Sequence, residues 1–215
     1  ILVLGYFRPV EEVGWYSATQ RLIQLIYLLP GIFAIAIFPV LSRLSRENDE
    51  KIRNLLEKVI GVSMLISLPM AAGGIITALP LMTLIFGSGY IPATLSLQIL
   101  LLTLVVNFTA TIISNAIFSY DLQKTLIVFA AIGVVLNLIL DLLFVPAYGL
   151  NGSAWATFVA QLIANAYLWH AMNKINRIKV FGGLKKIFLA TILMAGISWL
   201  MLQWGVPVIV VIITA

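Results

Sequence analysis

Residues 59–120 contain no Asp, Glu, Lys or Arg. This charge-free run is about three times as long as the ~20 apolar residues that one α-helix needs to cross a bilayer. Its clearest interruption, residues 87–92 (Gly-Ser-Gly-Tyr-Ile-Pro), combines glycine and proline as a tight turn between two helices does. The run therefore predicts two consecutive membrane-spanning helices.

The composition extends this interpretation to the whole chain. Of the 215 residues, 62% are hydrophobic and 10% are charged, whereas soluble domains carry about a quarter charged residues. The apolar runs are continuous, which favours helices, because the strands of a membrane barrel would alternate apolar and polar residues. The predicted fold class is all-α, a polytopic membrane helix bundle. Its complete spans are predicted at residues 16–41, 59–86, 93–120, 125–145, 153–172 and 187–204.

The basic residues predict which side of the membrane each connection faces. Of the 13 Lys and Arg residues, all but Arg8 and Arg21 fall in the polar gaps at 42–58, 121–124 and 173–186. These gaps alternate along the chain with gaps that hold almost no basic residue. Because basic loops are retained in the cytoplasm, we place the three gaps on that side. The same bias explains the net charge of +5 without a nucleic-acid partner.

The gap at 42–58 has two interpretations. Ile52, Leu55, Leu56 and Val59 recur at helical spacing, which is typical of a helix lying along the membrane surface before the next span. A solvated charged linker is the alternative, because acidic residues are mixed with the basic ones there. Neither interpretation implies a partner.

Polar side chains recur at helical spacing inside four of the predicted spans. An amide that faces lipid would lack a hydrogen-bond partner, so we expect these stripes to point into the bundle. These side chains either form hydrogen bonds between helices, each of which stabilises the bundle by about 0.6 kcal/mol, or line a hydrated cavity. For the set as a whole we favour the cavity. The candidate cavity residues are Arg21, Gln24, Tyr27, Asn107, Thr111, Asn137 and Gln161.

Two charged residues lie in the outer part of the predicted spans. The side chain of Arg21 either snorkels out to the headgroups or holds an anionic substrate, since its donor fork matches phosphate. Asp141 is a structural carboxylate at a helix end, an ion- or proton-coupling group, or an ion-pair partner of Arg21. The sequence leaves these roles open.

Motifs of enzyme chemistry are missing from the sequence. It contains no HExxH metal motif, no phosphate-binding loop and no convincing acid–base pair, and it has no Cys. We therefore predict no catalytic residue, no metal site and no cofactor, in a protein that is not an enzyme. Among non-enzymes, the polar stripes favour a transporter over a membrane scaffold.

Four stretches of the sequence resemble a known transporter family. Residues 13–18 (Val-Gly-Trp-Tyr-Ser-Ala), followed by Arg21, and residues 38–42 (Phe-Pro-Val-Leu-Ser) resemble the start and the end of the eighth span of polysaccharide-export flippases. Residues 136–141 (Leu-Asn-Leu-Ile-Leu-Asp) and 145–157 (Val-Pro-Ala-Tyr-Gly-Leu-Asn-Gly-Ser-Ala-Trp-Ala-Thr) closely resemble the signature where the eleventh and twelfth spans of that family meet. These polysaccharide biosynthesis or O-antigen-type flippases belong to the multidrug/oligosaccharidyl-lipid/polysaccharide exporter superfamily.

The resemblance implies an architecture and a function. It makes the chain the C-terminal lobe of a MATE-like two-lobe transporter. Residues 1–172 would form the lobe bundle, from the tail of span seven to span twelve, and residues 173–215 a cytoplasmic basic loop, a thirteenth span and a truncated fourteenth. The implied activity is movement of lipid-pyrophosphate-linked oligosaccharides across the cytoplasmic (inner) membrane by alternating access, for polysaccharide or lipopolysaccharide O-antigen export. The implied partners are this substrate, membrane lipids and polysaccharide assembly proteins.

Three related or competing functions remain. Drug or cation antiporters of the same superfamily resemble one another in carrying acidic residues in the seventh, eighth or tenth spans, and residues 16–41 and 93–120 contain none. A flippase for lipid-linked peptidoglycan precursors differs only in its substrate. A membrane glycan polymerase or ligase would need a sizeable outer loop, which the predicted spans do not leave.

Overall fold

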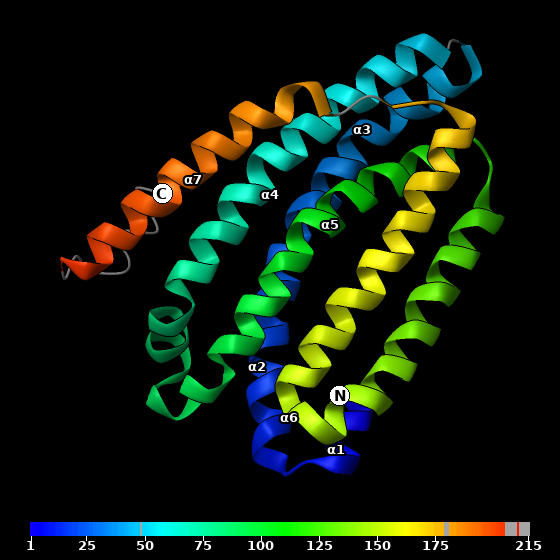
Figure 1. The fold of residues 1–215 in the computed structure, drawn as a ribbon. Helices are drawn as coiled ribbons and strands as arrows, with labels where there is room; N and C mark the ends of the chain where they lie inside the picture. The colour runs from blue at the N-terminus through cyan, green and yellow to red at the C-terminus, as the bar shows by residue number, and fades with distance from the viewer. Residues whose placement is uncertain (48, 179–180, 205–209, 211–215) are drawn as a thin grey trace.

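The computed structural model describes residues 1–47, 49–178, 181–204 and 210, and within these ranges the chain forms a helical bundle (Figure 1). The predicted all-α fold class is confirmed. The predicted truncated fourteenth span, after residue 205, lies almost wholly outside the described residues. The elements are α1 (Leu2–Phe7), α2 (Val10–Ile26), α3 (Leu28–Glu47), α4 (Asp49–Phe86), the 3₁₀ helix η1 (Ser88–Ala93), α5 (Thr94–Ser119), α6 (Gln123–Ile175) and α7 (Phe181–Gln203).

Each predicted span lies in one of these helices or in a consecutive pair of them. In the described part of the chain, four segments are long and apolar enough to cross a membrane, and the apolar helix Ile187–Gln203 is shorter. The 53 residues of α6 would extend for roughly 80 Å as one rod, far beyond a ~30 Å hydrocarbon core. They form two antiparallel halves instead, because the backbone leaves helical geometry at Gly149 (φ 57°, ψ −135°). Figure 1 shows the two halves side by side, so α6 contains the two predicted spans at 125–145 and 153–172.

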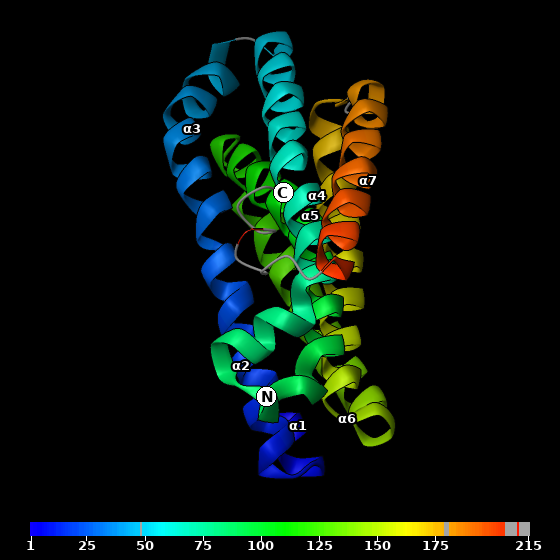
Figure 2. The same cartoon turned by 90° about the vertical axis from the view of Figure 1, so that its left-hand side faces the viewer.

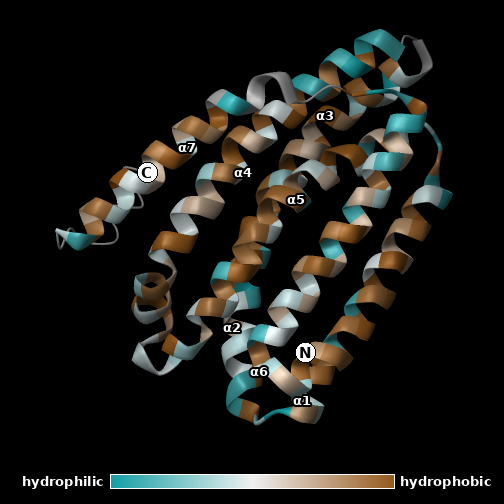
Figure 3. Ribbon diagram, in the orientation of Figure 1, coloured by the Kyte–Doolittle hydropathy of each residue, from teal (hydrophilic) through white to brown (hydrophobic). Residues whose placement is uncertain are grey.

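The connections sort to the two ends of the bundle as the charges predict. The α3–α4, α5–α6 and α6–α7 connections, which hold the basic gaps, lie at one end (Figures 1 and 2). The α1–α2 junction, η1 and the reversal of α6 lie at the other end. Hydrophilic residues gather mainly toward the ends of the helices, with hydrophobic residues between them (Figure 3). The positive-inside bias predicts that the basic end faces the cytoplasm, so we call it the inner end of the bundle and the opposite end the outer end.

The segment after Asn48 corrects one interpretation of the sequence. α4 begins at Asp49 and continues without a break to Phe86, so residues 49–58 prolong a span and do not lie along the membrane surface. The side chains of Ile52 and Leu56 are fully buried in the inner half of the bundle. The helical spacing of these apolar residues therefore reflects packing against neighbouring helices, not contact with lipid.

α5 is the central helix of the bundle. Of its most apolar stretch, 67% is buried, compared with 17% for α2–α3 and 6% for α6. It contributes to both apolar clusters of the core, through Leu100 and Leu104 in the outer one and Ile112 and Ile113 in the inner one. The exposed apolar side chains of α6 face outward, where a membrane would surround them with lipid.

Candidate functional site

A group of polar side chains joins three helices near the middle of the bundle. The amide of Asn107 on α5 donates to the Tyr27 hydroxyl at 2.6 Å and to Gln161 Oε1 at 2.8 Å. The Tyr27 hydroxyl also shares a hydrogen bond with Thr103. Tyr27 lies where α2 ends and α3 begins, and Gln161 lies on the second half of α6. We call Tyr27, Thr103, Asn107 and Gln161 the middle polar layer.

A second group lies nearer the outer end and joins α2 to both halves of α6. The Tyr16 hydroxyl shares a hydrogen bond with Thr157 Oγ1 at 3.1 Å and accepts one from the Gln20 amide at 2.8 Å. Asn137 donates to the same Thr157 hydroxyl at 3.2 Å. Beside them, the Ser153 hydroxyl donates to Asp141 Oδ1 at 2.9 Å. These residues form the outer polar layer: Tyr16, Gln20, Asn137, Asp141, Ser153 and Thr157.

Helical spacing explains why these side chains meet. Residues four apart lie on the same face of a helix, one turn above the other. Ser153, Thr157 and Gln161 follow this spacing on α6 and connect the outer layer to the middle layer. Thr103 and Asn107 repeat it on α5. The result is a polar column inside a bundle whose other buried side chains are mostly apolar.

The structure places the predicted site residues in three settings. Tyr27, Asn107, Asn137 and Gln161 belong to the polar layers. Thr111 donates to the carbonyl of Asn107 at 2.8 Å, a bond within its own helix. Arg21 and Gln24 are exposed on α2, and the structure records no hydrogen bond or ion pair for either among the residues that it describes.

Asp141 and Arg21 are not paired in this structure. Asp141 is 6% exposed and its carboxylate accepts from Ser153, whereas Arg21 is exposed. A buried carboxylate needs such hydrogen bonds, because an unsatisfied charge away from water is costly. This geometry matches the structural role considered for Asp141 and leaves its carboxylate beside the hydroxyls and amides of the outer layer.

Sequence reasoning selected only part of these layers. The candidate cavity residues do not include Gln20, Thr103 or Thr157, which the structure places in the polar layers. From the sequence, Tyr16 and Ser153 stand out only as parts of the stretches 13–18 and 145–157, which resemble the flippase family. Tyr16 lies four residues before Gln20, and Ser153 lies four residues before Thr157. This helical spacing is the signal that could have added Tyr16 and Ser153 to the candidates.

Apart from the Asp141 carboxylate, the column consists of neutral hydrogen-bonding groups. Hydroxyls and amides both donate and accept, as sugar hydroxyls do. Among the described residues there is no group of three or more His, Cys, Asp and Glu side chains that could hold a metal ion. Arg21 is the exposed cation nearest to the column along α2, and a guanidinium is suited to phosphate.

We expect Tyr27→Phe to lower the free energy of unfolding by about 0.6–1.7 kcal/mol, from the average to the largest contribution measured for a hydrogen bond between membrane helices. The substitution leaves Asn107 and Thr103 without their shared partner. Denaturant unfolding in detergent measures the change. The matched control is Tyr6→Phe, since Tyr6 is 84% exposed. Equal effects of the two substitutions would contradict the contribution of this layer to stability.

Comparison with known proteins agrees with this architecture. The chain is 25% identical over 199 residues to the probable low-salt glycan biosynthesis flippase Agl15 of Haloferax volcanii, which covers 92% of the chain and 42% of that protein. It is 25% identical over 178 residues to the probable flippase AglR of the same organism, covering 80% of the chain and 37% of AglR. The chain thus spans less than half the length of these curated relatives.

A solved structure shares the fold. The chain superimposes on the lipid II flippase MurJ in its inward closed conformation with a TM-score of 0.76, over 98% of this chain and 48% of that one, at 24% identity. The family model described as lipid II flippase MurJ matches residues 10–214, nearly the whole sequence. The chain therefore belongs to the lipid II flippase MurJ family, within the superfamily that the sequence motifs indicate.

Proposed function

We propose that this protein is a flippase that moves lipid-pyrophosphate-linked oligosaccharides across the cytoplasmic membrane by alternating access, for export of cell-surface glycans. The observation that carries the proposal is the polar column formed by Tyr16, Thr157, Gln161, Asn107 and Tyr27 inside membrane-spanning helices. Membership of a flippase family supports it. Residues 1–172 would supply the C-terminal lobe of the transporter.

The physical problem of this transport is the headgroup. Sugar hydroxyls lose their hydrogen bonds in hydrocarbon, at a cost of several kcal/mol for each unsatisfied group, whereas the lipid tail can remain in the bilayer. A column of hydroxyls and amides can exchange its internal hydrogen bonds for bonds to sugar. The diphosphate needs a cation, and Arg21 is our candidate because it is exposed and directly follows Gln20 of the outer polar layer in α2.

The nature of the glycan separates two forms of the proposal. Two curated relatives named as flippases, one of them for low-salt glycan biosynthesis, favour an oligosaccharide of a surface polysaccharide. The family description favours a lipid II-type peptidoglycan precursor as the second candidate. The O-antigen type of substrate and the polysaccharide assembly proteins as partners are narrower forms of the first candidate.

A vesicle assay with the complete protein tests the function. A fluorescent lipid-linked oligosaccharide is placed in both leaflets, and its accessibility to an external quencher is followed over time. We expect the reconstituted protein to move this lipid faster than protein-free vesicles do. Lipid II in parallel vesicles distinguishes the two glycan classes. Movement of small organic cations without any glycolipid movement would contradict the proposal and favour the antiporter.

The same vesicles test a coupling role for Asp141, the carboxylate of the outer layer. Ion gradients are applied one at a time across the membrane. If Asp141 couples transport to an ion, a gradient that accelerates the native protein has no effect on Asp141→Asn. A substitution that preserves the gradient response leaves Asp141 with its structural role.

A further inference from the structure

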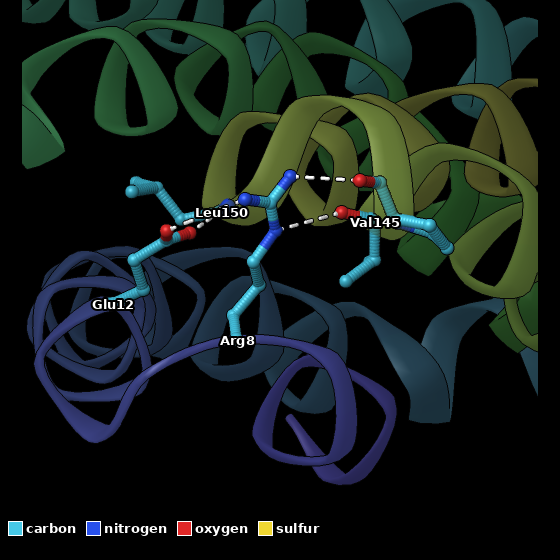
Figure 4. A network of polar contacts seen from close by, with 5 residues as sticks. Arg8, Glu12, Val145 and Leu150 are labelled. Atoms are coloured by element: carbon cyan, nitrogen blue, oxygen red, sulfur yellow. Dashed lines mark hydrogen bonds and ion pairs between the residues drawn. The ribbon is translucent and has the colours of Figure 1, made fainter.

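The reversal of α6 at Gly149 exposes backbone groups that a continuous helix would pair. In an unbroken helix the amide of residue 150 would donate to the carbonyl of residue 146. At a break, the last carbonyls of the first half and the first amides of the second half lose such partners. The carbonyls of Val145 and Pro146 and the amide of Leu150 lie at this break (Figure 4).

Arg8 and Glu12 supply the missing partners. Arg8 donates from Nε to the Val145 carbonyl at 3.2 Å and from Nη2 to the Pro146 carbonyl at 2.9 Å. Glu12 Oε2 accepts from the Leu150 amide at 3.0 Å, and Glu12 Oε1 lies 3.9 Å from Arg8 Nη1. Figure 4 shows the two side chains reaching from the α1–α2 corner to the two sides of the break.

The charges match the helix ends that they contact. The C-terminal end of a helix carries partial negative charge and its N-terminal end partial positive charge. Arg8 contacts the end of the first half of α6, and Glu12 contacts the beginning of the second half. One cation and one anion, a helical turn apart in the sequence, therefore stabilise both ends of the break.

The glycine at the break is fitted to this contact. A Cβ atom at residue 149 would lie 2.3 Å from Glu12 Oε2 and 3.4 Å from Arg8 Nε. The backbone there also has a positive φ that non-glycine residues rarely adopt. Gly149 thus permits both the turn and the close approach of Glu12. We call Arg8, Glu12 and Gly149 the outer clasp.

The outer clasp is joined to the outer polar layer through α2. Glu12, Tyr16 and Gln20 recur every fourth residue, so they lie on one face of this helix. One turn after Glu12 contacts the break, Tyr16 contacts Thr157. The bond between Ser153 and Asp141 crosses from one half of α6 to the other. The geometry of this layer therefore depends on how the two halves and α2 are held together.

We propose that Arg8 and Glu12 are positioning residues: the outer clasp fixes the angle between the two halves of α6 and so places Asp141 against Ser153 and Tyr16 against Thr157. The arrangement itself is independent of the cargo. Its importance for transport rests on the proposed function. The experiment therefore has one arm that measures geometry and one that measures movement of lipid.

The first arm measures the distance between the two halves of α6. Nitroxide labels are attached to Cys introduced at Leu138 and Ile163, both exposed and on opposite sides of Gly149. The 215 residues contain no native Cys, so this region has no competing thiol. We expect a narrow distance distribution in the otherwise native protein and a broader or shifted one in Arg8→Met and Glu12→Met. Gly149→Ala should act in the same direction.

Matched variants separate the clasp from general effects of substitution. Glu12→Gln keeps an oxygen that accepts from Leu150 and should keep the native distribution, unlike Glu12→Met. Gly14→Ala and Gly133→Ala test alanine where a Cβ meets nothing closer than 3.8 Å, and should also be native. If Gly149→Ala does not fold, the two Met variants decide. Native distributions in both Met variants would overturn the proposal.

The second arm follows glycolipid in vesicles. Where the native protein moves the labelled lipid-linked oligosaccharide, we expect Arg8→Met and Glu12→Met to slow it several-fold, while Glu12→Gln retains most of the rate. Native rates in both Met variants would remove the link between the outer clasp and transport. A native protein that moves no glycolipid would refute the proposed function, while the label distances would still decide whether the clasp positions the two halves.

Discussion

Gly152→Ala is expected to cause the largest loss of stability, about 3 kcal/mol or more, at the upper end of what overpacking costs. A Cβ atom at this position would lie 2.4 Å from the carbonyl oxygen of Phe144 and 2.7 Å from its carbon. Both are backbone atoms of the other half of α6, so no side-chain rotation can relieve the contact. The two halves would have to separate where they pack most closely.

Thermal unfolding in detergent, followed by tryptophan fluorescence, measures this loss. Gly133→Ala is the matched control in the same helix, because a Cβ there would lie 3.8 Å from Ala164, an ordinary contact. We expect Gly133→Ala to unfold near the native temperature. A Gly152→Ala protein as stable as this control would show that the two halves are farther apart than the structure places them.

Arg21→Gln is expected to have the largest effect on transport. Arg21 is exposed on α2 and the structure records no partner for it among the described residues, so its guanidinium is available to a diphosphate. A hydrogen bond to a charged group contributes about 1.5–3 kcal/mol. Its loss corresponds to roughly a ten- to hundredfold lower translocation rate, at about 1.4 kcal/mol per factor of ten. Stability should hardly change, since the substitution removes no recorded hydrogen bond or ion pair.

The rate of glycolipid movement in vesicles, at equal amounts of reconstituted protein, provides the measurement. Arg21→Lys separates the two roles that the sequence leaves open. If Arg21 binds phosphate through its donor fork, lysine restores the charge but only part of the rate. If Arg21 only reaches out to the headgroups, lysine restores the rate fully. A native rate in Arg21→Gln would exclude Arg21 from substrate binding.

The helices and their order could be predicted from the sequence because membrane insertion imposes a simple requirement. About 20 apolar residues must be continuous, and glycine and proline mark where the chain turns back. Gly149 and the Gly87–Pro92 turn lie where the chain turns back. The basic gaps indicate which end of the bundle faces the cytoplasm. Spacing also predicted that Asn107 on α5 and Gln161 on α6 would face other helices, which the hydrogen bond between them confirms.

The orientation of α2 and the outer clasp could not be predicted in this way. In a membrane protein the lipid is as apolar as the core, so hydrophobicity does not separate an outward face from an inward one. Helical spacing alone therefore groups Arg21 and Gln24 with Tyr27, although they are exposed and Tyr27 is hydrogen-bonded within the bundle. Arg8 contacts the carbonyls of Val145 and Pro146, more than 130 residues away, and no local pattern encodes such a pairing.

The burial of α5 has a consequence for how this helical bundle can move. A central helix that packs against α2, α3, α4 and α6 cannot slide past one of them without losing contacts with the others. Under the proposed transport function, these helices should therefore move together, as one rigid body, when cargo binds or leaves. Bending is expected to concentrate at its edges, where α7 packs mainly against a single neighbour.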